Sequence, residues 1–196
     1  KDKAGKAVVL RTAKKNVRYT LPNQPIRVIY RSDRSGTSGN FTAWLSGVAP
    51  TTWSKPRNDT FVTAFPGSIN AGGNIGRIVG ASSSTGVSQL AAASKYTITY
   101  AEVSYGEKFN LKAAAIGNAS GNFALPNGAN TGAFLASSKV GASGFFTFDY
   151  QTKEPGAYTL GIVSYMLGDT NYKDKAALPA IRALSLIHIS EPTRPY

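Results

Sequence analysis

The sequence contains no cysteine and only one histidine, His188, among its 196 residues. The absence of cysteine excludes disulfide frameworks, thiolate zinc sites and cysteine nucleophiles. His188 lies in a segment that we set aside below, and without it histidine triads and histidine-ligated metals are excluded as well. We therefore expect no catalytic residue, no metal site and no cofactor.

Long apolar runs are also absent. No stretch of about 18 apolar residues occurs, so no membrane-spanning helix is predicted. The chain opens on Lys1-Asp2-Lys3 without an initiator methionine or the apolar core of a signal peptide. We interpret this start as the interior of a longer protein, whose signal or anchor would lie upstream.

Acidic residues are scarce. Ten Asp and Glu stand against 22 Lys and Arg, a formal net charge of +12, while 42% of the residues are hydrophobic, enough for a packed core. Such a charge indicates an anionic partner: nucleic acid, a phosphate-bearing surface or a small oxyanion. The basic run Lys1–Arg18 lacks interleaved aromatic residues, which favours a solvated face over a nucleic-acid site. The scattered acids form no carboxylate pair of the kind that hydrolases use.

The end of the chain needs separate treatment. Residues Leu184–Arg194 resemble the conceptual translation of a sequencing adapter, which contaminates metagenomic assemblies. We interpret residues 184–196 as a non-native tail and exclude them from the fold. We then expect that the native sequence is interrupted near Ala183 and that its true C-terminus is unknown.

The remaining sequence alternates short strands and helices. The apolar, β-branched run Ile26–Tyr30 predicts a buried strand, and the spacing of Phe41, Trp44 and Leu45 predicts a helix from near Ser35 to before Pro50. This alternation predicts an α/β fold with a largely parallel sheet. The other predictions are loops around a short helix at Gly67–Gly86, helices at Val87–Ala93, near Ala101–Tyr105, within Pro126–Ser143 and from Lys173, an extended Leu111–Ile116, and strands at Tyr96–Tyr100, Phe145–Tyr150 and Ala157–Leu167.

One stretch carries the chemistry of an anion site. Arg31–Ser38 lies between the predicted strand and the predicted helix, whose first N–H groups are unpaired and positively polarised. Ser35, Thr37 or Ser38 can cap the helix, and Gly36 lets the backbone approach a ligand. Arg31 offers a fork of donors that Asp33 can hold in place. From the residues alone, a plain capped loop with a surface salt bridge remains an open alternative, since no P-loop motif occurs.

The chain resembles the phosphate-binding proteins of Pst-type ABC transporters, and more widely the type II periplasmic binding proteins. The resemblance extends from about Lys14 to Ala183. Its densest motif is Arg31-Ser32-Asp33-x-Ser35-Gly36-Thr37, and the further matches are Leu21–Ile26, Phe41, Leu45, Gly86-Val87 and Tyr96–Tyr105. It implies a two-lobe α/β fold, with residues 1–122 as the second lobe, which carries the anion site, and residues 123–183 as a return segment towards an incomplete first lobe.

The resemblance also implies roles for individual residues. Arg31, Ser35, Gly36 and Thr37 would donate hydrogen bonds to phosphate, and Asp33 would orient Arg31. Position 34, usually Gly in the family, is Arg34 here, which places a second positive charge beside the site or directs it to solvent. Glu102 is interpreted as a structural partner rather than a ligand. The first lobe would supply a carboxylate that accepts a proton from phosphate and rejects sulfate.

The function implied is that of an extracytoplasmic solute-binding protein, not an enzyme. It would capture inorganic phosphate as a monomer and deliver it to the permease subunits of an ABC importer, with membrane contact only through an upstream anchor or the transporter. Binding of another oxyanion, sulfate or molybdate, remains an alternative, and a basic nucleic-acid-binding module is a less favoured one. Because half of the site would come from elsewhere, we expect the 196-residue chain alone to bind phosphate weakly.

Overall fold

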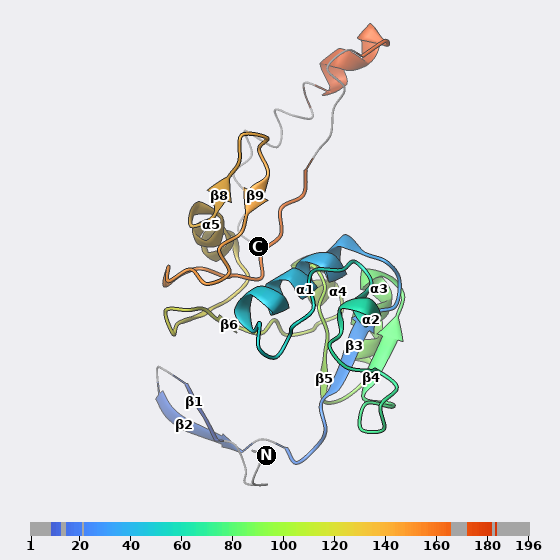
Figure 1. Cartoon of the computed structure of the whole chain (residues 1–196), viewed down its shortest axis with the longest axis vertical. Coiled ribbons are helices and arrows are strands. Elements are labelled where there is room, and N and C mark those ends of the chain that lie inside the picture. Colours follow the sequence, from blue (N-terminus) through green and yellow to red (C-terminus); the bar gives the residue numbers. More distant parts are fainter. Residues whose placement is uncertain (1–8, 13–14, 21, 166–171, 182, 184–196) are drawn as a thin grey trace. The chain divides into compact units, whose positions relative to one another are not determined.

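The computed structural model describes residues 9–12, 15–20, 22–165, 172–181 and 183 (Figure 1). The segment interpreted as a non-native tail, residues 184–196, lies outside the described residues. The fold consists of two compact units: residues 1–38 with 58–111, and residues 39–57 with 112–196. Helix α1 (Gly36–Val48) begins in the first unit and continues into the second. The assignment of residues 1–122 and 123–183 to two lobes stays a prediction.

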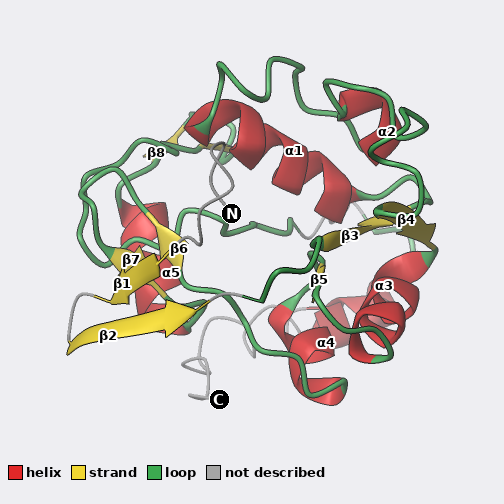
Figure 2. Cartoon of the chain, turned by 90° about the horizontal axis from the view of Figure 1, so that it is seen from below, coloured by secondary structure: helices red, strands yellow, loops and turns green. Residues whose placement is uncertain are grey.

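A three-stranded parallel sheet forms the centre of the first unit. Its order is β4 (Ile78–Ala81), β3 (Arg27–Arg31) and β5 (Thr97–Ile98), with Val28 opposite both Ile78 and Ile98. The unit also contains helices α2 (Phe61–Ala64), α3 (Ser83–Ala92) and α4 (Val103–Lys108) (Figure 2). An antiparallel hairpin of β1 (Val9–Thr12) and β2 (Lys15–Thr20) precedes the sheet in the sequence.

The central strand β3 is covered on both faces. Ile29 is fully buried and clusters with Val87 and Ala91 of α3. The next residue, Tyr30, points to the opposite face, since side chains alternate along a strand, and stacks on Phe61 of α2 with ring centroids 4.9 Å apart. Burial on both faces is typical of parallel sheets and explains why this strand reads as a continuous apolar run.

The described part of the second unit combines short antiparallel hairpins with helical segments. Its strands are β6 (Ile116–Gly117), β7 (Phe123–Ala124), β8 (Lys139–Val140) and β9 (Phe146–Thr147). Besides the continuation of α1, it contains helix α5 (Gly128–Ala136) and a 3₁₀ turn η1 (Lys175–Ala177). Phe134 of α5 is fully buried and stacks on Phe148 at 5.4 Å between ring centroids. Trp44 of α1 donates from Nε1 to Oγ1 of the buried Thr159 at 3.0 Å.

Most predicted elements are confirmed, and the α/β class with a parallel sheet is among them. The strand predicted at Ile26–Tyr30 is β3, and the helix predicted from near Ser35 to before Pro50 is α1. The helix predicted at Val87–Ala93 is α3, which begins four residues earlier. The strand predicted at Tyr96–Tyr100 is reduced to β5.

Two predictions are wrong. The glycine-rich stretch Gly67–Gly86 contains a strand of the main sheet, β4, rather than loops around a helix alone. Its Gly80 serves close packing, because a Cβ there would lie 3.0 Å from Tyr30 Cζ and 3.0 Å from Ser32 Cβ. The strand predicted at Ala157–Leu167 does not form over residues 157–165, where Tyr158 N donates to the carbonyl of Asn130 in α5 at 3.0 Å.

Candidate functional site

The candidate site lies where β3 ends. Arg31 is the last residue of β3 and pairs with Ala81, the last residue of β4, so both strands deliver their carboxyl ends to the same edge of the sheet. The chain then turns through residues 32–35 and enters α1 at Gly36. Crevices at the carboxyl ends of parallel strands are the usual place for ligand sites in open α/β folds.

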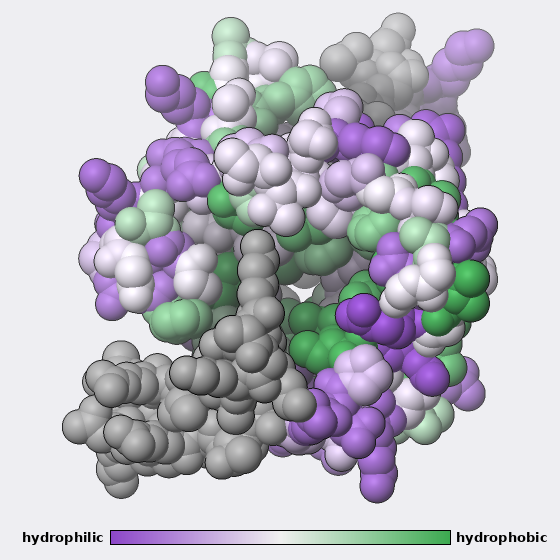
Figure 3. Space-filling model, turned by 60° about the horizontal axis from the view of Figure 1, so that its bottom comes forward, coloured by the Kyte–Doolittle hydropathy of each residue, from purple (hydrophilic) through white to green (hydrophobic). Residues whose placement is uncertain are grey.

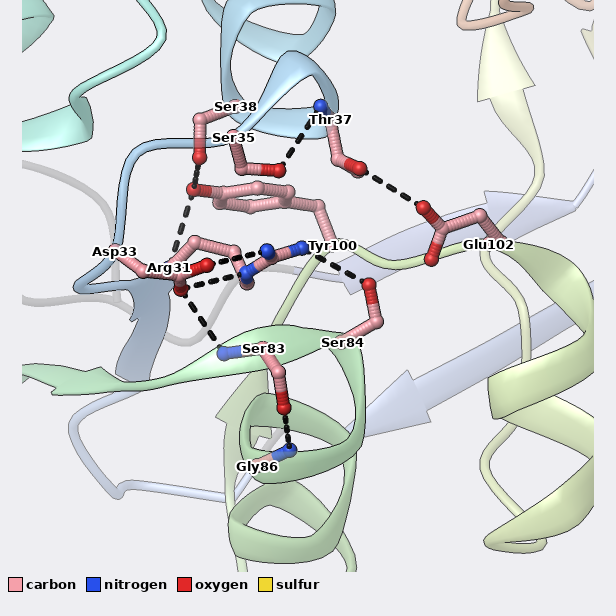
Figure 4. A network of polar contacts seen from close by, with 10 residues as sticks. All are labelled: Arg31, Asp33, Ser35, Thr37, Ser38, Ser83, Ser84, Gly86, Tyr100 and Glu102. Atoms are coloured by element: carbon pink, nitrogen blue, oxygen red, sulfur yellow. Dashed lines mark hydrogen bonds and ion pairs between the residues drawn. The ribbon is translucent and has the colours of Figure 1, made fainter.

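The Arg31 guanidinium is held by two partners, Asp33 and Ser84 (Figure 4). Nε donates to Asp33 Oδ1 at 2.8 Å, Nη2 donates to Asp33 Oδ2 at 2.6 Å, and Nη1 donates to Ser84 Oγ at 2.9 Å. The side chain of Arg31 is 11% exposed and that of Asp33 is 34% exposed. The hydrogen bonds from Arg31 hold the pKa of Asp33 well below its usual range, and the pKa of Arg31 is raised by the same pair.

Asp33 also connects this loop to the start of α3. Its Oδ1 accepts from the backbone N–H of Ser83 at 2.9 Å. Ser83 has a φ of +64°, the left-handed region that a non-glycine residue seldom adopts, and its Oγ accepts from Gly86 N at 3.3 Å. The Asp33 carboxylate therefore both orients Arg31 and anchors the first turn of α3.

The start of α1 has the cap that the sequence predicts. Ser35 Oγ accepts from Thr37 N at 3.1 Å, the usual geometry of an N-cap serine. No acidic residue belongs to the first turn of α1 itself. A Cβ built on Gly36 would meet no atom within 4 Å, which means that open space lies beside this residue.

Tyr100 joins β3 to α1. Its Oη accepts from Arg31 N at 3.2 Å and shares a hydrogen bond of 2.7 Å with Ser38 Oγ. Ser38 is fully buried and Tyr100 is 8% exposed, and this burial raises the pKa of the phenol. These contacts fix the backbone of Arg31 against the first turn of the helix.

Glu102 faces the site from the turn before α4. Its Oε1 accepts from Thr37 Oγ1 at 2.8 Å. Burial raises the pKa of Glu102, but the hydroxyls of Ser84 and Thr37 and the charge of Arg31 stabilise the carboxylate, and the net effect is a lowered pKa. The hydroxyl proton of Thr37 is thus directed at Glu102, in agreement with the predicted structural role of this carboxylate.

Arg34, which stands where glycine was expected, points to solvent. Its side chain is 83% exposed, and its Nε lies 3.7 Å from Asp59 Oδ2. Ser35 N donates to the Asp59 carbonyl at 2.9 Å, so the turn closes with arginine at this position. An ion pair this exposed contributes little to stability.

The structure gathers all the residues singled out from the sequence: Arg31, Asp33, Ser35, Gly36 and Thr37. Their role as ligands stays a prediction. Sequence reasoning missed the contributions of Ser83, Ser84 and Tyr100. Tyr100 belongs to the segment Tyr96–Tyr105, and Ser83 and Ser84 lie just before Gly86-Val87. Both segments were among those that carry the family resemblance. The sequence did not indicate which atoms these side chains would contact.

The described residues contain neither a metal-ligand cluster nor a membrane-spanning helix. Over residues 9–165 and 172–183, with their undescribed gaps, no three His, Asp or Glu side chains come together as metal ligands would. Within the same ranges, no helix has the length and apolar character needed to cross a membrane.

Comparison with known proteins gives matches over most of the chain. A family model described as a PBP superfamily domain matches residues 11–180. The chain is 32% identical over 170 residues to "Phosphate-binding protein PstS 2" of Mycobacterium tuberculosis (strain ATCC 25618 / H37Rv), covering 83% of this chain and 42% of that protein. It is 29% identical over 171 residues to "Phosphate-binding protein PstS3" of Mycobacterium bovis, covering 84% and 43%.

A further relative matches over a shorter stretch of the chain. "Phosphate-binding protein PstS" of Methanocaldococcus jannaschii is 34% identical over 106 residues, which are 54% of this chain and 26% of that protein. The chain thus spans less than half the length of the curated relatives it matches.

Proposed function

The chain belongs to the PBP superfamily, and from this premise we propose that it binds inorganic phosphate outside the cytoplasm and presents it, as a monomer, to the permease subunits of an ABC importer. The observation that carries the proposal is the Arg31 guanidinium, held by Asp33 and Ser84 beside the capped start of α1. The names of its relatives support phosphate as the ligand.

The donors suit a tetrahedral oxyanion. A guanidinium has five N–H groups, and the contacts within the described residues use three, which leaves one on each terminal nitrogen for a ligand. The positive end of α1 and the hydroxyl of Ser35 lie on the same side of the turn. Because the arginine is already oriented, binding would cost little side-chain entropy.

Net charge is not what attracts the anion. Asp33 and Glu102 together offset the single charge of Arg31, and Arg34 is exposed. Binding would therefore depend on directed hydrogen bonds and the helix dipole, and it should change little with ionic strength, unlike binding to an exposed basic patch.

We further propose that this site is one side of a two-sided pocket completed by residues beyond it. The chain alone would then bind phosphate with a dissociation constant on the order of millimolar, since only part of the hydration shell is replaced. The proposed work is capture without turnover, in keeping with relatives that are named as binding proteins.

The test is an NMR titration of the 196-residue chain with inorganic phosphate. We expect saturable shifts confined to Arg31 Nε and to the amides of residues 35–38 and 83–84. Arg31→Ala should abolish them, whereas Arg57→Ala, at an exposed arginine outside the site, should leave them unchanged. Sulfate run in parallel tests the alternative oxyanion.

Two outcomes would contradict the proposal. Shifts spread over the basic surface and lost at high salt would mean non-specific anion binding. Micromolar or tighter affinity from the chain alone would contradict the two-sided pocket while leaving phosphate binding itself in place.

A further inference from the structure

A concave region lies at the opposite end of the parallel sheet from Arg31. It is a hollow of about 440 Å³ lined, among others, by Gln24, Arg27, Gly76, Arg77, Lys95 and Tyr96. We call this region the basic hollow. Arg27 is the first residue of β3, Arg77 immediately precedes β4, and Tyr96 immediately precedes β5. Parallel strands bring their amino ends together, so the hollow lies where all three connections enter the sheet.

Backbone hydrogen bonds hold the three connections in place. Arg27 N donates to the Tyr96 carbonyl at 2.8 Å, and Val28 N donates to the Arg77 carbonyl at 2.7 Å. The backbone that carries the cationic side chains is therefore fixed by hydrogen bonds. Arg27 and Arg77 are 50 residues apart in the sequence, and Arg77 and Lys95 are 18 residues apart. The fold brings these three cationic residues together, and the sequence shows no run of charged residues that would predict it.

Three positive charges meet here without a negative one among the described residues. No acidic residue lines the hollow, and the ion pairs found in the described part of the chain are those of Arg31 with Asp33 and Arg34 with Asp59. The side chains of Arg27, Arg77 and Lys95 are all exposed. Figure 3 shows hydrophilic residues scattered over the face in view. The hollow, by contrast, brings three cationic residues together in one concavity.

Tyr96 adds an uncharged donor to this set. It has a φ of +57°, in the left-handed region that costs a tyrosine energy, and its side chain is 49% exposed. Its hydroxyl and the amide of Gln24 can donate hydrogen bonds beside the cations.

We propose that the basic hollow is a second anion site, which binds a short polyphosphate chain. Its volume lies in the range of pockets for small organic ligands and exceeds what one orthophosphate fills. Two arginine forks and one lysine match a row of phosphate groups, each able to accept from a different cation. A concave surface favours such a small flexible anion over a flat protein face. This inference is independent of the proposed function at Arg31.

The test is a calorimetric titration of the full chain with tripolyphosphate, with amide shifts recorded in parallel. We expect one saturable site, with shifts at residues 24–27, 76–77 and 93–96. The double variant Arg77→Gln and Lys95→Gln should weaken binding about tenfold or more, the loss of charge-assisted hydrogen bonds. The matched double variant Lys112→Gln and Lys139→Gln, which removes two exposed lysines elsewhere, should bind as the parent chain does. Circular dichroism checks that every variant is folded.

Each opposing outcome overturns the inference. If Arg31→Ala abolishes tripolyphosphate binding and the Arg77 and Lys95 variant does not, the chain uses the Arg31 site for both anions. If the two double variants weaken binding equally, the effect is general surface charge. If a single-stranded oligonucleotide of equal charge binds the hollow equally well, the region is a non-selective polyanion surface and not a polyphosphate site.

Discussion

Arg31 and Asp33 meet edge to edge through two parallel hydrogen bonds, Nε to Oδ1 at 2.8 Å and Nη2 to Oδ2 at 2.6 Å. The carboxylate binds the edge of the guanidinium formed by Nε and Nη2. The remaining N–H groups, on Nη1 and Nη2, point away from the carboxylate. Ser84 accepts one of those on Nη1 at 2.9 Å. The pair therefore determines the direction in which Arg31 can offer hydrogen bonds to an anion.

Replacing Arg31 by lysine keeps the charge and removes the fork. Arg31→Lys should weaken phosphate binding by about tenfold or more, because an ammonium group cannot hold Asp33 through two bonds and still offer aligned donors. The measurement is the phosphate titration followed by NMR, with Arg57→Lys, at an exposed arginine outside both proposed sites, as the matched control. Unchanged affinity in Arg31→Lys would show that only the charge matters.

The Arg31–Asp33 pair should give a distinct pH dependence. Hydrogen bonding from Arg31 lowers the pKa of Asp33 in the folded state, so the folded protein binds fewer protons than the unfolded chain, in which an Asp titrates near about 3.9. The stabilisation is present above that value and is lost as the pH falls through the folded-state pKa.

Carboxyl ¹³C shifts of Asp33 measure this directly. We expect the residue to titrate below the usual range of aspartates, and Arg31→Ala to return its pKa towards about 3.9. Titration of Asp33 in the usual range in the parent chain would mean that the pair is not formed in solution.

Removing the charge of Glu102 should strengthen phosphate binding. In Glu102→Gln the amide oxygen can still accept from Thr37, but the negative charge that faces the site is gone. Less repulsion should tighten phosphate binding severalfold, about 1 kcal/mol for charges this close to solvent. Glu107→Gln, an exposed acid on the neighbouring helix α4, is the matched control. Weaker binding of phosphate in Glu102→Gln, with sulfate unaffected, would show instead that Glu102 accepts a proton from the ligand.

Gly80 should tolerate no side chain. A Cβ there would press on Tyr30 Cζ and Ser32 Cβ, both at 3.0 Å, where the edge strand β4 pairs with β3. Gly80→Ala should lower the free energy of unfolding by about 1–3 kcal/mol, the usual cost of overpacking. Gly72→Ala, where a Cβ meets no atom within 4 Å, should change it by much less. Urea denaturation of both variants gives the comparison, and equal effects would contradict the assigned packing.

Local patterns were sufficient for the elements around the site. The apolar run of β3 and the spacing of Phe41, Trp44 and Leu45 predicted a strand, a loop and a helix in the right places. Strand β4 was not predicted, because it contains Gly80. A sequence does not distinguish a glycine needed for close packing, as against Tyr30 here, from a glycine needed for a turn. The predicted strand at Ala157–Leu167 had suitable residues, but the backbone N–H of Tyr158 donates to Asn130 of α5.

The sequence by itself determined the short-range part of the candidate site, since Arg31, Asp33, Ser35 and Thr37 lie within seven residues and their spacing dictates the capped turn and the ion pair. Only the tertiary structure decided that Ser84, Tyr100 and Glu102 complete the surroundings of that turn, and that Arg27, Arg77 and Lys95 face one hollow. These residues are 18 to 69 positions away from their partners. Contacts over such separations depend on the order and register of parallel strands, and those are set by the packing of the whole sheet rather than by any local pattern.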